Sequence, residues 1–185
     1  MQKLSVSIML AAGLAAPVAV ADSADQSHSW ENEPTAFLGV PFHGNFMKNV
    51  PECPEKPERP TMICRSSTSD PSQYEIRGLP YIPISSGYQL FATIQSDAIT
   101  QMMLTGNASS LELVDDFLTD TLGQPNSSVS RRIQLTSGAS YEIKSSSWEG
   151  KKIAVHFQRD EKDLSRYAVI FTPTTPPSPN PKTPG

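Results

Sequence analysis

The stretch "SSLELVDDFLTDTLGQP", residues 109–125, predicts the principal helix of the protein. Ser109 is a candidate N-cap, and Glu112 three residues later would complete a capping box. Gly123 stands where a left-handed C-cap belongs. The apolar residues fall on one helical face, and they are Leu111, Val114, Phe117, Leu118 and Leu122. We therefore expect one amphipathic helix at about residues 109–122.

Downstream of the helix the hydrophobic period changes from that of a helix to that of a strand. The alternating segments are "SVSRRIQLT", "SYEIKSSSW", "GKKIAVHFQR" and "RYAVIFT". The apolar sets are Val129, Ile133 and Leu135 (with Arg131 in line), then Ile153, Val155 and Phe157, then Tyr167, Val169 and Phe171. Short polar turns between such strands predict an antiparallel meander with one wet face. One helix must then cover the dry face, which predicts a two-layer α+β domain.

Upstream of the helix, "GYQLFATIQSDAITQMMLTG" predicts a hairpin that turns at Ser96-Asp97. The run "FLGVPF", residues 37–42, predicts one short strand where the fold begins. In "YEIRGLPYIPI", Pro80 and Pro83 restrict the segment to an edge strand or an extended connection.

The first 21 residues predict a signal peptide. Lys3 provides the positive charge, residues 4–16 the apolar run, and Ala19-Val20-Ala21 an A-x-A cleavage site. We therefore expect a mature chain that starts at Asp22, is soluble without a membrane anchor, and lies in the periplasm or outside the cell.

The mature chain divides by composition. Residues 22–36 lack apolar periodicity and predict a flexible leader in which Trp30 alone is a candidate for docking. Residues 37–172 form a single α+β domain, and the proline-dense residues 173–185 predict a disordered tail.

The charge of the chain restricts its partners. Cleavage of the signal peptide removes Lys3 and shifts the formal net charge from −4 to −5. A protein that binds nucleic acid or an anionic membrane surface needs a cationic field, so this charge argues against both kinds of partner.

The segment "VPECPEKPERPTMIC", residues 50–64, holds both cysteines and a proline at every third position. In an exported protein the pair predicts a disulfide between Cys53 and Cys64, with free thiols or an intermolecular bond as alternatives. A full-length polyproline rod would hold the two Cα atoms about 8 Å apart, beyond the reach of a disulfide. The segment is therefore expected to reverse near Pro57 as a stapled loop. Its acidic edge could meet a partner, and the residues that form it are Glu52, Glu55 and Glu58.

The helix ending "FLTDTLGQP" and the later strands with Trp148 resemble a recurrent pattern in small exported bacterial proteins. The resemblance covers about residues 109–172. The layering is similar to the helix-on-sheet modules of β-lactamase-inhibitor-like and outer-membrane assembly accessory proteins. It implies a binding module without catalysis, and it carries no specific binding residue to this chain.

Two further features are candidate interaction sites. The helix displays three acidic residues at i, i+4 and i+8, namely Glu112, Asp116 and Asp120, which repel one another. A basic partner, or Arg131 or Arg132 of a neighbouring strand, would relieve this repulsion. An ordinary solvated helix face explains the same pattern. Trp148 could belong to an interface, although packing against the helix is the alternative that we favour.

Motifs for catalysis are weak. No G-x-S-x-G elbow or paired carboxylates occur, and no cofactor is expected. His28, His43 and His156 lack the spacing of zinc ligands, and His43 fits a turn. The sequence therefore predicts an exported, non-enzymatic binding protein with an envelope or secreted protein as partner. A small hydrolase that uses a serine, His156 and an acidic residue is the alternative, and a structural envelope component is a third.

Overall fold

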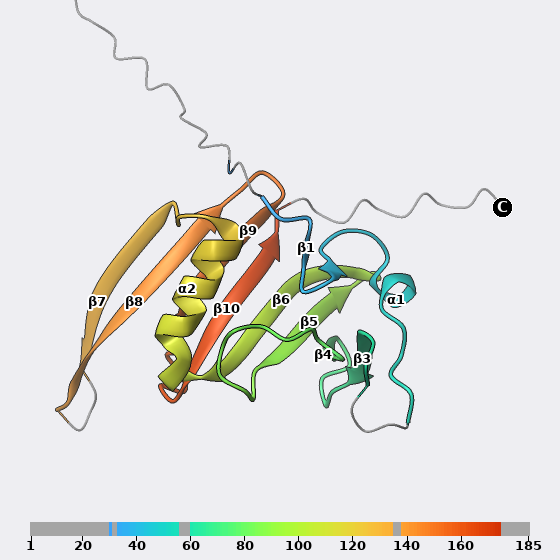
Figure 1. The fold of residues 1–185 in the computed structure, drawn as a ribbon, viewed down its shortest axis with the longest axis horizontal. Helices are drawn as coiled ribbons and strands as arrows, with labels where there is room; N and C mark the ends of the chain where they lie inside the picture. Colours follow the sequence, from blue (N-terminus) through green and yellow to red (C-terminus); the bar gives the residue numbers. More distant parts are fainter. Residues whose placement is uncertain (1–29, 31–32, 56–59, 135–137, 175–185) are drawn as a thin grey trace, which may run out of the picture.

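The computed structural model describes residues 30, 33–55, 60–134 and 138–174, and it confirms the predicted α+β class. Eight antiparallel strands form one sheet in the order β3–β4–β5–β6–β10–β9–β8–β7, with one principal helix packed against it (Figure 1). The sheet strands are β3 Cys64–Ser67, β4 Gln73–Arg77, β5 Gln89–Gln95, β6 Ala98–Asn107, β7 Ser127–Gln134, β8 Ser140–Glu149, β9 Ile153–Arg159 and β10 Arg166–Pro173. The other elements are β1 Ala36–Phe37, β2 Val40–Pro41, α1 Phe46–Asn49, the 3₁₀ turn η1 Ala108–Ser110, and α2 Leu111–Leu122.

The sheet consists of two meanders that meet in its middle. Strands β3 to β6 follow one another on one side, and β7 to β10 follow one another on the other. The helix α2 connects the two halves, and β10 returns beside β6 from Arg166↔Asn107 to Phe171↔Met102. The meander predicted after the helix is therefore confirmed, and β10 also closes the sheet onto the upstream hairpin.

The predicted helix is present, but it begins differently. The chain leaves β6 through η1, where the side chain of Asn107 accepts a hydrogen bond from the Ser109 N–H at 2.8 Å. Ser110 is the N-cap of α2 and makes no side-chain capping bond, so the predicted Ser109–Glu112 capping box is wrong. At the other end Gly123 is the C-cap as predicted, and its N–H donates to the Thr119 carbonyl. Its φ of +83° and ψ of −172° lie outside the left-handed helical region, so the predicted left-handed conformation is wrong, although the positive φ still favours glycine.

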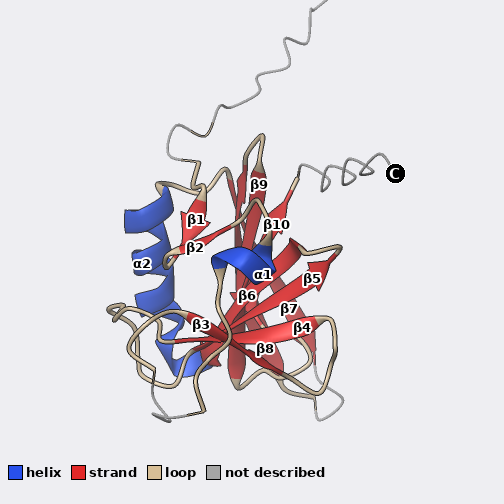
Figure 2. Ribbon diagram, turned by 90° about the vertical axis from the view of Figure 1, so that its right-hand side faces the viewer, coloured by secondary structure: helices blue, strands red, loops and turns tan. Residues whose placement is uncertain are grey.

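One face of the sheet holds the hydrophobic core. Figure 2 shows α2 and the short strands β1 and β2 on the same side of the sheet. The Phe37 and Phe42 rings pack on Phe171 with centroids 4.3 and 5.5 Å away. The residues predicted to alternate inward on β9 and β10 are all buried, and they are Ile153, Val155, Phe157, Tyr167, Val169 and Phe171.

Residues 37–42 form a hairpin rather than the single strand predicted. Leu38 and Gly39 have φ of +49° and +86°, so the chain reverses between β1 and β2. A Cβ on Gly39 would lie 2.6 Å from the Ile63 side chain, which favours glycine in this turn.

Part of the predicted flexible leader contacts the domain. The Trp30 indole N–H donates to the Leu122 carbonyl at 2.7 Å, so its predicted docking is confirmed. The Glu33 carboxylate accepts the Ile153 N–H at 2.8 Å and also the Lys152 N–H. Residues 1–29, which include the predicted signal peptide, and residues 175–185 of the predicted tail lie outside the described residues.

The edge strand β7 departs from its amphipathic prediction. Val129 is 55% exposed, only Ile133 of the eight residues is partly buried, and Leu135 lies outside the described residues. Lys144 and Ser146 of β8 contact Asp115 of α2, so β8 residues of even number face the helix. Val129 pairs with Ser145 and therefore faces away from the helix. The alternation in β7 is real, but its apolar side does not meet the core.

Candidate functional site

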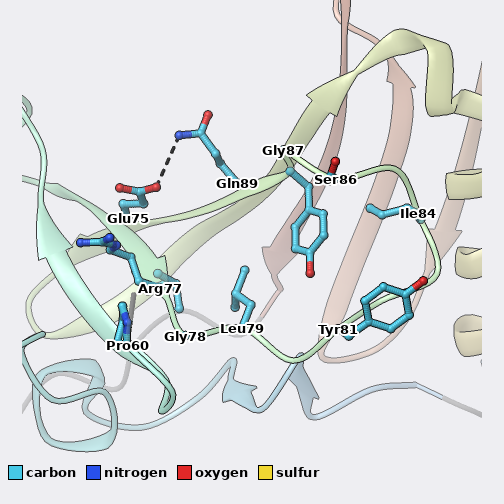
Figure 3. A pocket seen from close by; sticks show the side chains of 12 residues that line it. Pro60, Glu75, Arg77, Gly78, Leu79, Tyr81, Ile84, Ser86, Gly87 and Gln89 are labelled. Carbon is cyan, nitrogen blue, oxygen red and sulfur yellow. Dashed lines mark hydrogen bonds between the residues drawn. The ribbon is translucent and has the colours of Figure 1, made fainter. Parts of the chain in front are cut away.

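A groove of about 520 Å³ lies beside the connection between β4 and β5. Figure 3 shows residues 78–88 curving round it, with Leu79 pointing into the groove and Pro60 on the opposite side. Aromatic and apolar side chains mix here with a carboxylate, an amide and a guanidinium. The lining includes Glu75, Leu79, Tyr81, Ile84, Tyr88 and Gln89. Such a mixture is typical of a ligand-binding groove.

Backbone geometry fixes the segment that surrounds the groove. Gly78 has φ +69°, and a Cβ there would lie 2.0 Å from the Met62 carbonyl oxygen, so only glycine fits. Ile82 and Ile84 are buried and anchor the segment to the core. The Tyr88 hydroxyl donates to the Pro80 carbonyl at 3.1 Å. The anchored segment holds the Tyr81 side chain 86% exposed at the rim of the groove.

A chain of polar contacts leads from the groove to the middle of the sheet. The Gln89 amide donates to the Glu75 carboxylate at 3.4 Å, as drawn in Figure 3. Arg166 donates to the Gln89 amide oxygen at 3.4 Å and to the Thr105 hydroxyl at 3.3 Å. Thr105 in turn donates to the Tyr167 carbonyl at 2.7 Å. These contacts orient Glu75 and Gln89, so the groove presents both acceptors and donors in a defined arrangement.

Arg166 has neutral hydrogen-bond partners. Neither ion pair found among the described residues involves it. Its partly buried guanidinium therefore adds positive charge near the Glu75–Gln89 end of the groove, where Coulomb interactions are stronger than in water.

Tyr167 lies beneath this polar chain with its ring against the backbone of β6. A Cβ on Gly106 would lie 2.7 Å from the Tyr167 hydroxyl oxygen. That hydroxyl is buried and meets no hydrogen-bond partner in the described part of the chain. Burial raises the pKa of Tyr167 to about 12. Glycine is therefore required at position 106, because the Tyr167 side chain lies across it and leaves no room for a Cβ.

We expect the Gly106→Ala variant to lose about 2 kcal/mol of unfolding free energy, because the added methyl overpacks the Tyr167 ring. Tyr167→Phe removes a hydroxyl without losing a described hydrogen bond and is expected to be neutral or slightly stabilising. The double variant should recover part of the Gly106→Ala loss. Urea titrations of the four proteins measure this coupling. If the changes in unfolding free energy of the two single variants simply add in the double variant, the close approach of Gly106 and the Tyr167 hydroxyl is contradicted.

The predicted disulfide between Cys53 and Cys64 is confirmed, with Cα atoms 4.8 Å apart. Glu52 pairs with Arg65 as an isolated parallel bridge, which fixes the start of the loop beside β3. Glu52 and Glu55 are exposed. Glu58 and the predicted reversal near Pro57 lie outside the described residues.

The acidic face of α2 is solvent-exposed. Glu112, Asp116 and Asp120 are exposed. Lys144 pairs with the neighbouring Asp115 at 2.9 Å. Arg131 pairs with Glu161 of the β9–β10 turn, and no ion pair joins Arg132 to any described acid. Relief of the acidic face by Arg131 or Arg132 is therefore not found, because Lys144 is the base that reaches this helix.

The other candidate interaction residue, Trp148, is fully buried. Its indole N–H donates to the Gly123 carbonyl at 2.8 Å, joining β8 to the end of α2. An interaction role would need surface that this side chain does not expose.

The two histidines among the described residues, His43 and His156, do not line the groove. His156 is partly buried, with its Nε2 3.2 Å from the Gln158 amide oxygen, and β-sheet register places Ser147 opposite it. His43 is exposed. No group of three or more His, Cys, Asp or Glu residues able to hold a metal is present among the described residues. None of the described helices has the length and apolar composition needed to cross a bilayer.

Comparison with known proteins gives no family: no family model, curated protein or solved structure matches the chain. The resemblance to helix-on-sheet binding modules therefore stays a prediction. Sequence reasoning missed Tyr81, Gln89 and the groove itself. The available signal was the pair Gly78 and Gly87, which bracket a segment with two prolines and Tyr81.

Proposed function

We propose that the protein is an exported binding protein that holds its ligand in the groove beside residues 78–88. The observation that carries this proposal is Tyr81, an aromatic side chain 86% exposed on a segment that is anchored on both sides of it. Large exposed aromatic groups at a concave site are enriched in binding surfaces. Because the segment is already anchored, a ligand would not have to order it, which lowers the entropic cost of binding.

The chemistry of the groove defines what the ligand must offer. Tyr81 and Leu79 provide a flat ring and an apolar contact, and Glu75 and Gln89 provide an acceptor and a donor. The ligand therefore carries both an apolar face and hydrogen-bonding groups. Export is supported by the N-terminal signal pattern and by the Cys53–Cys64 disulfide, which is typical of oxidising compartments.

The test is selective retention on immobilised mature protein. Extract from the periplasm or culture medium is passed over the wild type, Tyr81→Ala and Tyr141→Ala, and retained components are identified by mass spectrometry. Tyr141 is a matched control because it is a second exposed tyrosine, 44% exposed, on β8. We expect at least one component to be retained about tenfold less by Tyr81→Ala than by the other two proteins.

Equal retention by all three proteins would contradict the groove as the binding site. Turnover of a retained component, abolished by His156→Ala, would favour the hydrolase alternative. A stoichiometric envelope complex that survives Tyr81→Ala would favour the structural alternative.

A further inference from the structure

The two edge strands of the sheet, β3 and β7, differ in how their outer backbone groups are covered. At the β3 edge, the Cys53 N–H donates to the Arg65 carbonyl at 2.9 Å, and the Arg65 N–H donates to the Pro51 carbonyl at 2.8 Å. The Arg65 guanidinium also donates to the Val50 carbonyl. The stapled segment therefore covers this edge and satisfies part of its backbone.

At the opposite edge, β7 is the outermost strand, and among the described residues its outer side is open (Figure 1). All eight of its residues pair in continuous register with β8, from Ser127↔Ser147 to Gln134↔Ser140. No second strand pairs with β7 within the described ranges. It has no proline, and its register shows no bulge. Long regular edges of this kind are templates for a further strand, and proteins usually shorten, bend or cover them.

The side chains of β7 indicate what a further strand must carry. Ser127, Ser128 and Ser130 are small and allow close approach, and Val129 adds an exposed apolar group. The neighbours Arg131 and Arg132 point to opposite faces because side chains alternate along a strand. Arg131 meets Glu161 in an exposed ion pair, which contributes little. Arg132 lies opposite Glu142 of β8 but forms no ion pair with a described residue.

We propose that β7 accepts an extended acidic segment of another protein as a ninth, antiparallel strand of the sheet. Every strand pair in the sheet is antiparallel, so the added strand would run opposite to β7. Read from its N-terminus it would carry acidic–acidic–x–apolar, with the acids opposite Arg132 and Arg131 and the apolar residue opposite Val129. Main-chain hydrogen bonds would supply affinity, and the acidic pair would supply selectivity.

Charge argues against a second copy of this chain as the occupant. Two β7 strands paired about a two-fold axis would bring four guanidinium groups onto one strand pair, and in the registers that set these arginines directly opposite one another the like charges are destabilising. The same two arginines attract an acidic strand. A purely defensive role, in which they only prevent self-association, predicts that no acidic peptide binds.

The first experiment uses amide hydrogen exchange of the full mature protein, followed by NMR. The probe is a synthetic peptide of the same length as β7 with the acidic–acidic–x–apolar pattern and threonine elsewhere. Alternate residues of an edge strand direct their N–H groups outward. We expect these outward amides of Ser127–Gln134 to exchange at least tenfold more slowly with saturating peptide. A peptide N-methylated at alternate residues should give no protection, because it cannot form the ladder.

The second experiment tests the charge requirement. Arg132→Glu is expected to weaken binding of the acidic peptide by about tenfold, and a lysine-for-acid peptide should bind the wild type at least tenfold more weakly. Lys48→Glu is the matched control: it makes the same charge change at an exposed residue of α1 and should leave binding unchanged. An unchanged melting temperature for both variants would exclude misfolding as the cause.

Three results would overturn the proposal. One is the absence of protection in β7 at saturating acidic peptide. Another is equal protection by the lysine peptide or the N-methylated peptide. The third is protection without peptide that rises with protein concentration, which would identify a second copy as the occupant.

Discussion

The Trp148→Ala protein is expected to lose about 3–5 kcal/mol of unfolding free energy, because it combines a core cavity with a lost hydrogen bond. The indole is fully buried between β8 and α2. Its removal leaves a cavity in a close-packed core and also leaves the Gly123 carbonyl without its donor. A loss of this size is a large fraction of the stability of a small domain. Urea unfolding followed by far-UV circular dichroism measures it.

Trp148→Phe separates the two contributions. The phenyl ring fills most of the cavity but cannot donate to Gly123, so we expect a loss of about 1–3 kcal/mol. Ligand retention on the groove should persist in this variant, because Trp148 does not line the groove. A Trp148→Ala protein of normal stability that fails to retain a partner would show instead that the indole acts at an interface.

The sequence predicted those elements in which the alternation of apolar residues matches their burial in the core. On β9 and β10 every second residue is apolar and buried in the core, so period and burial agree. The hairpin at Ser96-Asp97 was likewise predictable, since both residues adopt the positive φ that such a turn requires. These are local signals, and each of them corresponds directly to a position in the sheet or in its turn.

Other features depend on contacts that local pattern does not encode. Strand β7 alternates as regularly as β9, yet it is an edge strand. The last strand, β10, pairs with β6, so the second meander runs outward from β10 to β9, β8 and finally β7. Asn107, and not Ser109, provides a side-chain capping bond, because β6 runs directly into η1 and Asn107 is the N-cap of that turn. The groove combines Pro60 with residues of β4, β5 and their connection, which meet only after the sheet has formed.

The groove and the open β7 edge lie at opposite ends of the sheet (Figure 1). Substitutions at the two sites share no described contact, so their effects on stability are expected to add. The same separation allows binding at one site to be removed without disturbing the other. Tyr81→Ala and Arg132→Glu are therefore independent tests of the two proposals.

The Cys53→Ser/Cys64→Ser protein is expected to lose about 3 kcal/mol of unfolding free energy. The bond closes a loop with a sequence separation of 11, and opening it restores conformational freedom to the unfolded chain. Treatment of the wild type with reductant should produce the same loss, whereas the variant should not respond to reductant. Urea midpoints with and without reductant measure both effects.

Loss of the disulfide should destabilise the β3 edge before it affects the rest of the sheet. The stapled segment covers the β3 edge, so its release removes the partners of the Arg65 N–H and carbonyl. We expect hydrogen exchange to accelerate first at Cys53 and Arg65, while amides of β9 and β10 in the other half of the sheet keep their protection. Two alkylated cysteines in the wild type, after denaturation without reductant, would show that the bond is absent. Equal midpoints for the variant and the oxidised wild type would show that the loop is held by β3 contacts alone. The expected pattern instead makes the disulfide the element that keeps one edge of the sheet closed, while β7 remains the edge open to a partner.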